Sequence, residues 1–133
     1  MKQKNKFQPT ILVIENNLAT QKELAKKFEK AGYIVLVAAN GGEGLRELHK
    51  KPDVVVIDLF LPNMNSMSFL GFKDANPQFR DIPLFFVSSI DKPEELQQAY
   101  GPSAKGYFDP SQMKSEGIVK ELEEFLKQER DKK

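Results

Sequence analysis

Six polar residues stand directly after apolar segments of the chain, where their side chains could act together. Carboxylates, an amide and hydroxyls are the oxygen donors that a hard, hydrated cation such as Mg²⁺ accepts, together with waters and phosphate oxygens. A carboxylate among them can accept a phosphoryl group when a metal and hydrogen-bond donors offset the developing charge. The six residues are Glu15, Asn16, Asp58, Ser88, Ser89 and Asp109.

Asp58 is the candidate centre of this chemistry. It closes the uninterrupted apolar run 54–57 and is followed by Leu-Phe-Leu-Pro at 59–62. An apolar run without alternation is typical of a strand buried on both faces, and open α/β sheets bind their ligands at the carboxyl ends of such strands. Each strand-end residue alone could be a helix cap or a loop residue, but a shared sheet edge makes the group a candidate crevice.

Short apolar segments alternate with segments of helical periodicity five times along the chain. This order predicts an α/β fold, in which a five-stranded parallel sheet has right-handed crossovers and helices on both faces, the doubly wound (βα)5 arrangement. Asn17 is the predicted N-cap of the first helix and Gly32 its C-terminal stop. The predicted strands are 10–14, 34–38, 54–58, 84–88 and 106–108, and the predicted later helices are 41–50, 67–75, 93–100 and 111–127.

The composition excludes several classes of protein. The 133 residues suit one domain, which we expect over 9–128 between a flexible tail at 1–8 and a charged tail at 129–133. Twenty basic and 19 acidic residues leave a net charge of +1 and no electrostatic case for nucleic acid. The absence of cysteine excludes disulfides and thiolate metal sites. No apolar stretch approaches the ~20 residues of a membrane span or forms a signal peptide, so we expect a cytoplasmic protein without a membrane partner.

The chain resembles the receiver domain of two-component response regulators over essentially its whole length. The resemblance rests on four segments in order: ILVIEN at 11–16, DVVVIDLFLP at 53–62, IPLFFVSS at 82–89 and GYFDP at 106–110. It implies the flavodoxin-like receiver topology. It also implies phosphorelay signal transduction, with a sensor histidine kinase or a phosphotransfer protein as the donor.

The resemblance assigns a role to each matching residue. Asp58 matches the phosphoacceptor aspartate. Glu15 and Asn16 match the acidic pair that holds Mg²⁺, and the backbone carbonyl of Phe60 matches the third protein ligand. Ser88 matches the Ser/Thr that hydrogen-bonds the phosphoryl group and reports its arrival.

Further matching positions lie near the fifth strand. Pro110 matches a proline whose preceding peptide bond is typically cis, and Tyr107 aligns with the switch aromatic if the segment is one residue short.

Three residues depart from the family pattern. Asp109 stands where the family usually has a lysine that neutralises phosphoryl charge, and a carboxylate there adds repulsion instead. Asn16 removes one charge from the acidic pair, although an amide carbonyl can still bind the metal or hold a bound water. Ser66 replaces the glycine that is common after the turn, which stiffens or reshapes that loop.

Two functions remain open from these residues. The first is a switching receiver, in which Asp58 is phosphorylated and the only enzymatic step is self-phosphorylation and dephosphorylation. The alternative is a pseudo-receiver that serves as a phosphorylation-independent interaction module. An aspartate-nucleophile phosphatase is disfavoured because Phe60 stands where such enzymes carry a second aspartate, and the segment 15–18 does not resemble a flavin phosphate loop.

Any signal must leave through a protein surface. The resemblance implies the face formed by 93–100, 106–108 and 111–127, which could bind a downstream target or support a homodimer. Lone features have plainer explanations: His49 is expected to be a solvated helix-end residue, and Phe69 and Phe72 are expected to pack in the core.

Overall fold

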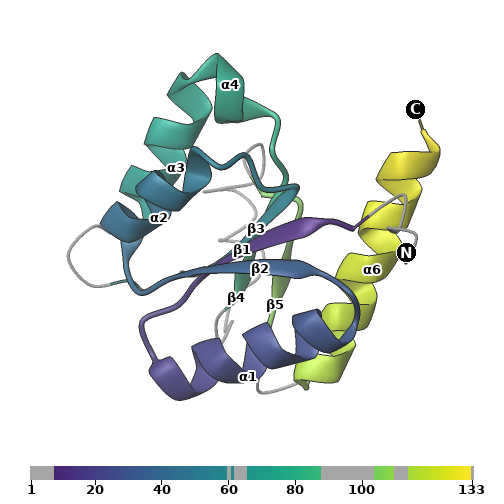
Figure 1. Cartoon of the computed structure of the whole chain (residues 1–133). Helices are drawn as coiled ribbons and strands as arrows, with labels where there is room; N and C mark the ends of the chain where they lie inside the picture. The colour runs from purple at the N-terminus through teal and green to yellow at the C-terminus, as the bar shows by residue number, and fades with distance from the viewer. Residues whose placement is uncertain (1–7, 60, 62–65, 88–103, 110–113, 133) are drawn as a thin grey trace, which may run out of the picture.

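The computed structural model describes residues 8–59, 61, 66–87, 104–109 and 114–132, apart from the side chains at 66, 67 and 115 (Figure 1). Five strands form one parallel sheet in the order β2-β1-β3-β4-β5, which confirms the predicted fold class. The strands are β1 (Thr10–Ile14), β2 (Ile34–Ala38), β3 (Val54–Asp58), β4 (Leu84–Val87) and β5 (Gly106–Phe108). The described helices are α1 (Leu18–Lys30), α2 (Gly41–Leu48), α3 (Ser66–Ala75), α4 (Pro77–Arg80) and α6 (Ser115–Asp131).

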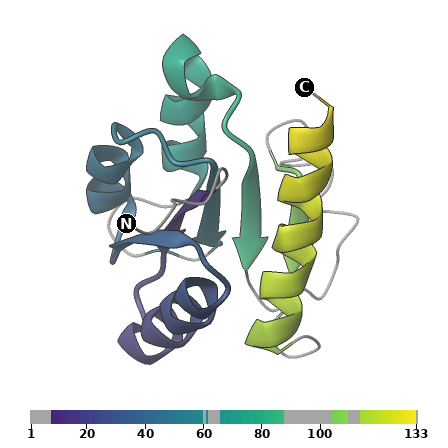
Figure 2. The same ribbon diagram turned by 45° about the vertical axis from the view of Figure 1, so that its right-hand side comes forward.

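The helices form two layers around the sheet. In Figure 1 and in the turned view of Figure 2, α1 and α6 cover one face, while α2, α3 and α4 cover the other. Alternate residues along the central strands therefore enter two different cores. Ile11 and Val13 of β1 pack toward α1 and α6, whereas Leu12 and Ile14 pack toward α2 and α3. Burial on both faces explains why these strands lack polar alternation.

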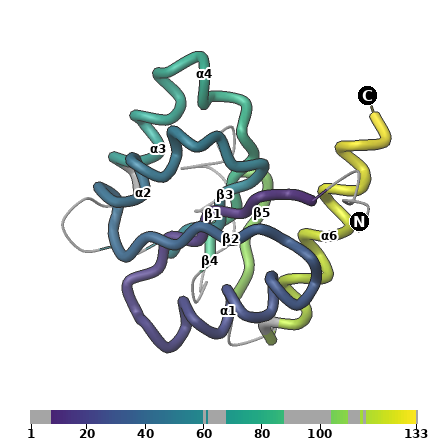
Figure 3. Tube along the Cα trace, in the orientation of Figure 1, coloured from purple at the N-terminus to yellow at the C-terminus, as the bar shows by residue number. Residues whose placement is uncertain are grey.

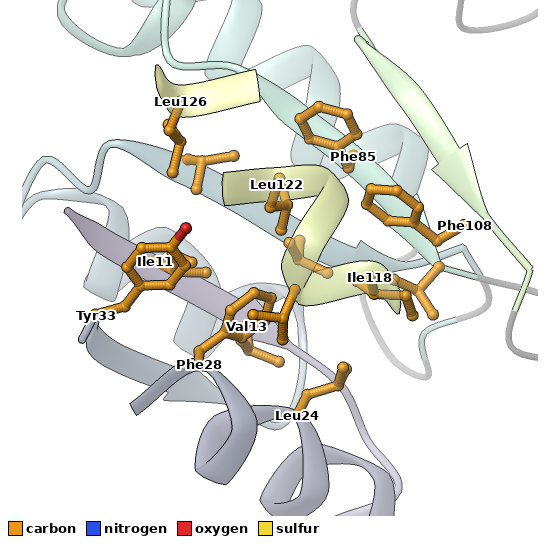
Figure 4. Close-up of a cluster of buried hydrophobic side chains, with 14 residues drawn as sticks. Ile11, Val13, Leu24, Phe28, Tyr33, Phe85, Phe108, Ile118, Leu122 and Leu126 are labelled. Atoms are coloured by element: carbon orange, nitrogen blue, oxygen red, sulfur yellow. The ribbon is translucent and has the colours of Figure 1, made fainter. Parts of the chain in front are cut away.

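The core beneath α1 and α6 joins distant parts of the chain. Figure 4 shows Phe28 of α1, Leu122 of α6 and Phe108 of β5 in one cluster with Ile11 and Val13 of β1. Phe85 stacks on Phe108 with ring centroids 5.2 Å apart and meets the edge of Phe125 at 5.1 Å. This packing holds β4 and β5 against α6, and so fixes the edge of the sheet at which these strands end.

Local signals begin and end helix α1 as the sequence predicts. The Asn17 side chain accepts a hydrogen bond from the Thr20 N–H at 2.9 Å, which confirms it as the N-cap of α1. Gly32 has a φ of 99°, a left-handed conformation that glycine adopts without steric cost, and it follows the C-cap of α1. Asn40 caps α2 in the same way, by accepting from the Glu43 N–H at 2.9 Å.

The second half of the chain departs from the prediction in several bounds, and the tube in Figure 3 follows its course. The sequence pattern does not predict the short helix α4, since Pro77 follows directly on the predicted helix 67–75 and its neighbour Asn76, yet proline also suits a first helical turn. Helix α6 begins at Ser115 rather than 111 and runs to Asp131. Residues predicted as a charged tail from 129 are thus helical as far as Asp131. The predicted helix 93–100 lies outside the described residues.

Two aromatic predictions had different outcomes. Phe69 is fully buried, as predicted, but Phe72 is 39% exposed and the prediction of core packing was wrong for it. Phe72 instead stacks on the buried Phe79 of α4, with ring centroids 6.4 Å apart.

His49 is exposed at the end of α2, where its Nδ1 atom lies 2.9 Å from the Leu45 carbonyl oxygen.

We predict opposite effects for the same substitution at two helical glycines. A Cβ atom at Gly44 would lie 2.6 Å from Ile14 Cδ1 and 3.2 Å from Phe69 Cε1, and both neighbours are fully buried. Gly44→Ala should therefore lower the free energy of unfolding by about 1–2 kcal/mol through overpacking. Gly71→Ala meets no atom within 4 Å and should raise it by about 0.5–1 kcal/mol through helix propensity. Urea denaturation measures both, and stabilisation by Gly44→Ala would contradict the packing.

Candidate functional site

The carboxyl groups of Glu15 and Asp58 meet at the carboxyl edge of the sheet. Ile14 of β1 pairs with Ile57 of β3, so the next residue of each strand emerges at the same level. A side-chain hydrogen bond joins the two carboxyl groups. The parallel register thus brings together two of the strand-end residues that the sequence singled out.

Backbone and side-chain hydrogen bonds fix the position of Glu15. Its N–H donates to the Ala38 carbonyl oxygen at 2.9 Å, which extends the pairing of β1 with β2. Its Oε2 atom accepts from the Asn17 N–H at 3.0 Å at the start of α1. The carboxyl group is therefore oriented by the loop that leads into the helix.

Gln21 is a supporting residue that sequence reasoning missed. It is buried on α1, and its Nε2 atom donates to the Glu15 carbonyl oxygen at 3.0 Å and to the Ala38 carbonyl oxygen at 3.2 Å. It thereby ties together the ends of β1 and β2. A signal was present, because Gln21 occupies the same apolar face as Leu24 and Phe28 at helical spacing.

The surroundings of Glu15 favour its protonated form. Burial, and then the nearby Asp58 carboxyl group, raise the pKa of Glu15 to about 7, although the backbone N–H of Asn17 opposes the shift. Two adjacent carboxyl groups can hold a divalent cation in place of the proton that Glu15 keeps. The donor set of two carboxylates and an amide fits Mg²⁺.

Asn16 lies at the exposed side of this pair. Its Nδ2 atom donates to the Ala39 carbonyl oxygen at 3.4 Å, so the amide reaches toward the end of β2. The Oδ1 atom is the donor that Asn16 can offer to a cation or to a water bound to it.

Asp109 and Tyr107 lie on the β5 side of the carboxyl edge of the sheet. Asp109 is half-buried directly after β5, whose Phe108 pairs with Val87 of β4. Tyr107 is half-buried and stacks on Phe86, with ring centroids 5.9 Å apart. Among the described residues, no three Asp, Glu, His or Cys side chains gather as a metal cluster, so Asp109 does not join Glu15 and Asp58 in one.

Four candidate residues lie outside the described residues: Phe60, Ser88, Ser89 and Pro110. The roles assigned to Phe60, Ser88 and Pro110 as metal ligand, phosphoryl hydrogen-bond donor and cis proline therefore stay predictions.

The chain belongs to the response regulator receiver domain family, whose model matches residues 11–123. Protein PilH of Pseudomonas aeruginosa is 29% identical over 92 residues, which make up 68% of this chain and 74% of PilH. Chemotaxis protein CheV3 of Helicobacter pylori is 25% identical over 115 residues, which cover 78% of this chain and only 37% of that protein.

Solved structures share the fold. The chemotaxis response regulator CheY4 of Vibrio cholerae has a TM-score of 0.81 at 23% identity, over 89% of this chain and 98% of that one. The N-terminal domain of a response regulator receiver protein from Methanoculleus marisnigri JR1 has a TM-score of 0.72 at 26% identity, over 76% of this chain and 83% of that one. Receivers of this family act in two-component signalling with histidine kinases or phosphotransfer proteins, and generally bind Mg²⁺ at the phosphorylation site.

Within the ranges that the structure describes, none of the helices combines the length and the apolar character that crossing a bilayer requires.

The raised pKa of Glu15 predicts a pH dependence of stability in metal-free buffer. The folded state keeps a proton to about pH 7 that the unfolded chain releases near pH 4.5. The stabilisation that comes from the proton on Glu15 is therefore complete below pH 4.5. The free energy of unfolding then falls by on the order of 3 kcal/mol as the pH rises to about 7. Glu15→Gln should lack this part of the dependence. Urea titrations between pH 4 and 8 measure it, and identical profiles for both proteins would contradict it.

Proposed function

We propose that this chain is a switching receiver that accepts a phosphoryl group on Asp58 from a histidine kinase or a phosphotransfer protein. The observation that carries the proposal is the Glu15–Asp58 carboxyl pair at the carboxyl edge of the parallel sheet. The pair places an acceptor carboxylate beside a second carboxyl group that can hold a cation against it.

In this proposal Glu15 and Asp58 bind Mg²⁺, with Asn16 and the backbone carbonyl of Phe60 completing the protein ligands. The cation offsets the charge of the incoming phosphoryl oxygens when it is bound. Asn16 supplies one charge fewer than a carboxylate would, so we expect weaker metal binding.

The transfer itself needs only one nucleophile from this chain. An Oδ atom of Asp58 forms the new bond to phosphorus while the phosphorus–nitrogen bond of a phosphohistidine breaks. The histidine keeps the bonding electron pair and takes up a proton. In the proposal the Ser88 hydroxyl donates a hydrogen bond to the transferred phosphoryl group.

Asp109 separates this receiver from the usual pattern. Its carboxylate lies after β5, at the edge where Asp58 also ends its strand. A negative charge at this edge opposes the gathering of phosphoryl oxygens, whereas the lysine of the family pattern would offset it. This observation also supports the second candidate function, a pseudo-receiver whose partner binding does not require phosphorylation.

The output of the proposed receiver is a protein–protein interaction. We propose that a downstream target binds the face formed by 93–100, β5 and α6, where a homodimer could also form. Catalysis is limited to self-phosphorylation and dephosphorylation at Asp58, and the proposed location is the cytoplasm.

Treatment of the protein with acetyl phosphate and Mg²⁺ should add one phosphoryl group, detected by intact mass. Asp58→Asn should abolish the adduct because an amide is not a competent acceptor, and removal of Mg²⁺ by EDTA should do the same. Ser68→Ala, at an exposed position on α3, is a control that should retain the adduct.

A defined set of results would exclude the switching receiver. If neither acetyl phosphate nor a panel of phosphorylated kinases yields an adduct, and if Mg²⁺ leaves the amide NMR shifts of Glu15 and Asp58 unchanged, the switching receiver is excluded. The pseudo-receiver then predicts that Asp58→Asn leaves partner binding intact.

Asp109→Lys should speed the modification of Asp58 by roughly tenfold, because it replaces a repelling charge with one that stabilises the phosphoryl oxygens. Asp109→Asn, which only removes the negative charge, should give an intermediate rate. The rates are followed by mass spectrometry at fixed acetyl phosphate and Mg²⁺. Equal rates for all three proteins would show that Asp109 does not act on the site.

A further inference from the structure

Lys73 is a buried lysine far from the carboxyl pair. It lies in the last turn of α3 with 1% of its surface exposed, among the largest fully buried side chains of the described chain. Its Nζ atom donates to the Arg80 carbonyl oxygen at 3.1 Å and lies 3.9 Å from Asp74 Oδ1, too far for a hydrogen bond. Within the described part of the chain, an ammonium group with three N–H donors thus has one hydrogen-bond acceptor.

A cavity of about 320 Å³ adjoins this lysine. It lies between the end of α3, the end of α4 and the starts of β4 and β5, at the amino-terminal edge of the sheet and so opposite the carboxyl pair. The Lys105 N–H donates to the Leu84 carbonyl oxygen at 2.8 Å, which fixes the backbone of Lys105 at the mouth of the cavity. The lining residues are Lys73, Asp74, Arg80, Asp81, Ile82, Pro83 and Lys105.

The charges around the cavity sum to an excess of one positive charge, from three cations and two carboxylates. Burial lowers the pKa of Lys73; the carboxylates of Asp74 and Asp81 oppose this shift, and the positive charge of Lys105 adds a smaller lowering. The carboxylates thus offset the cost of burying the ammonium group only in part. A buried ammonium group that has one hydrogen-bond acceptor among the described residues, beside a cavity whose lining carries an excess of one positive charge, forms a site for an anion.

We propose that this cavity binds a small oxyanion, a phosphate group or a carboxylate, between Lys73 and Lys105. The oxygens of the bound anion accept hydrogen bonds from the remaining N–H groups of Lys73. They also accept a charge-assisted hydrogen bond from Lys105. Arg80 holds the α3–α4 turn around the site, because its Nε atom donates to the Asp74 carbonyl oxygen at 3.1 Å. Water alone would supply acceptors but would leave the excess positive charge of the lining without a counterion.

The test uses the full chain in EDTA, with sodium phosphate or sodium acetate compared with sodium chloride at equal ionic strength. Amide NMR titration should show saturable shifts at Lys73, Asp81 and Lys105, and it gives the dissociation constant for each anion. At ten times that constant the melting temperature should rise roughly 4 °C. Saturation by phosphate but not by acetate assigns a phosphate group, and the reverse assigns a carboxylate.

Four variants decide whether the effect belongs to this cavity. Lys105→Met and Lys73→Met should both lose the anion-dependent rise in melting temperature. Lys120→Met, at an exposed lysine of α6 outside the cavity lining, should retain it, and so should Asp58→Asn. Methionine suits a buried site, so Lys73→Met should fold. The proposal is overturned if neither anion shifts these amides saturably, or if Lys105→Met responds to the anion as the wild type does.

Discussion

The rest of the structure depends on one constraint, that two carboxyl groups are held side by side at the end of buried strands. Glu15 and Asp58 would separate in water, where like charges repel and solvent offers better partners. They stay together because β1 and β3 are paired along their length and covered on both faces by helices. The hydrogen bonds from the Gln21 side chain and the Asn17 N–H then fix both the position and the orientation of Glu15. The fold thus holds the two carboxyl groups close together. A proton relieves the repulsion between them, and a bound cation could also relieve it.

The carboxyl edge carries its charges in an unusual balance. Compared with the family pattern that the sequence resembles, Asn16 carries one negative charge fewer beside Glu15, while Asp109 places a carboxylate where a lysine is usual. In the function that we propose, the first difference weakens attraction for a cation, and the second weakens attraction for a phosphoryl group. Both changes leave the strand ends and their packing intact, so the receiver architecture is retained while the electrostatics of the site differ. Binding chemistry can therefore vary on this scaffold without loss of the fold.

Buried ionisable groups occupy opposite edges of the sheet. Burial raises the pKa of Glu15 at the carboxyl edge and lowers the pKa of Lys73 at the amino edge, so that each shift favours the neutral form. Each group has a neighbour of like charge, Asp58 in one case and Lys105 in the other. Such positions are costly to maintain and are common where a ligand supplies the missing charge. Both ends of the same strands thus present polar groups whose partners among the described residues offset the cost of burial only in part.

The sequence by itself determined the five strands and their order along the chain, the N-cap at Asn17 and the C-terminal stop at Gly32, and the identity of the strand-end residues. These features are local, because apolar runs, helical spacing and turn residues act within a few positions of the chain. Only the tertiary structure decided that Glu15 contacts Asp58, that Gln21 supports them, and that Phe72 is exposed while Lys73 is buried. Phe72 and Lys73 lie in this way because α4 places Phe79 against Phe72 and offers the Arg80 carbonyl oxygen to Lys73. The short helix α4 comes after α3 in the chain, and its packing cannot be deduced from the periodicity of α3 alone.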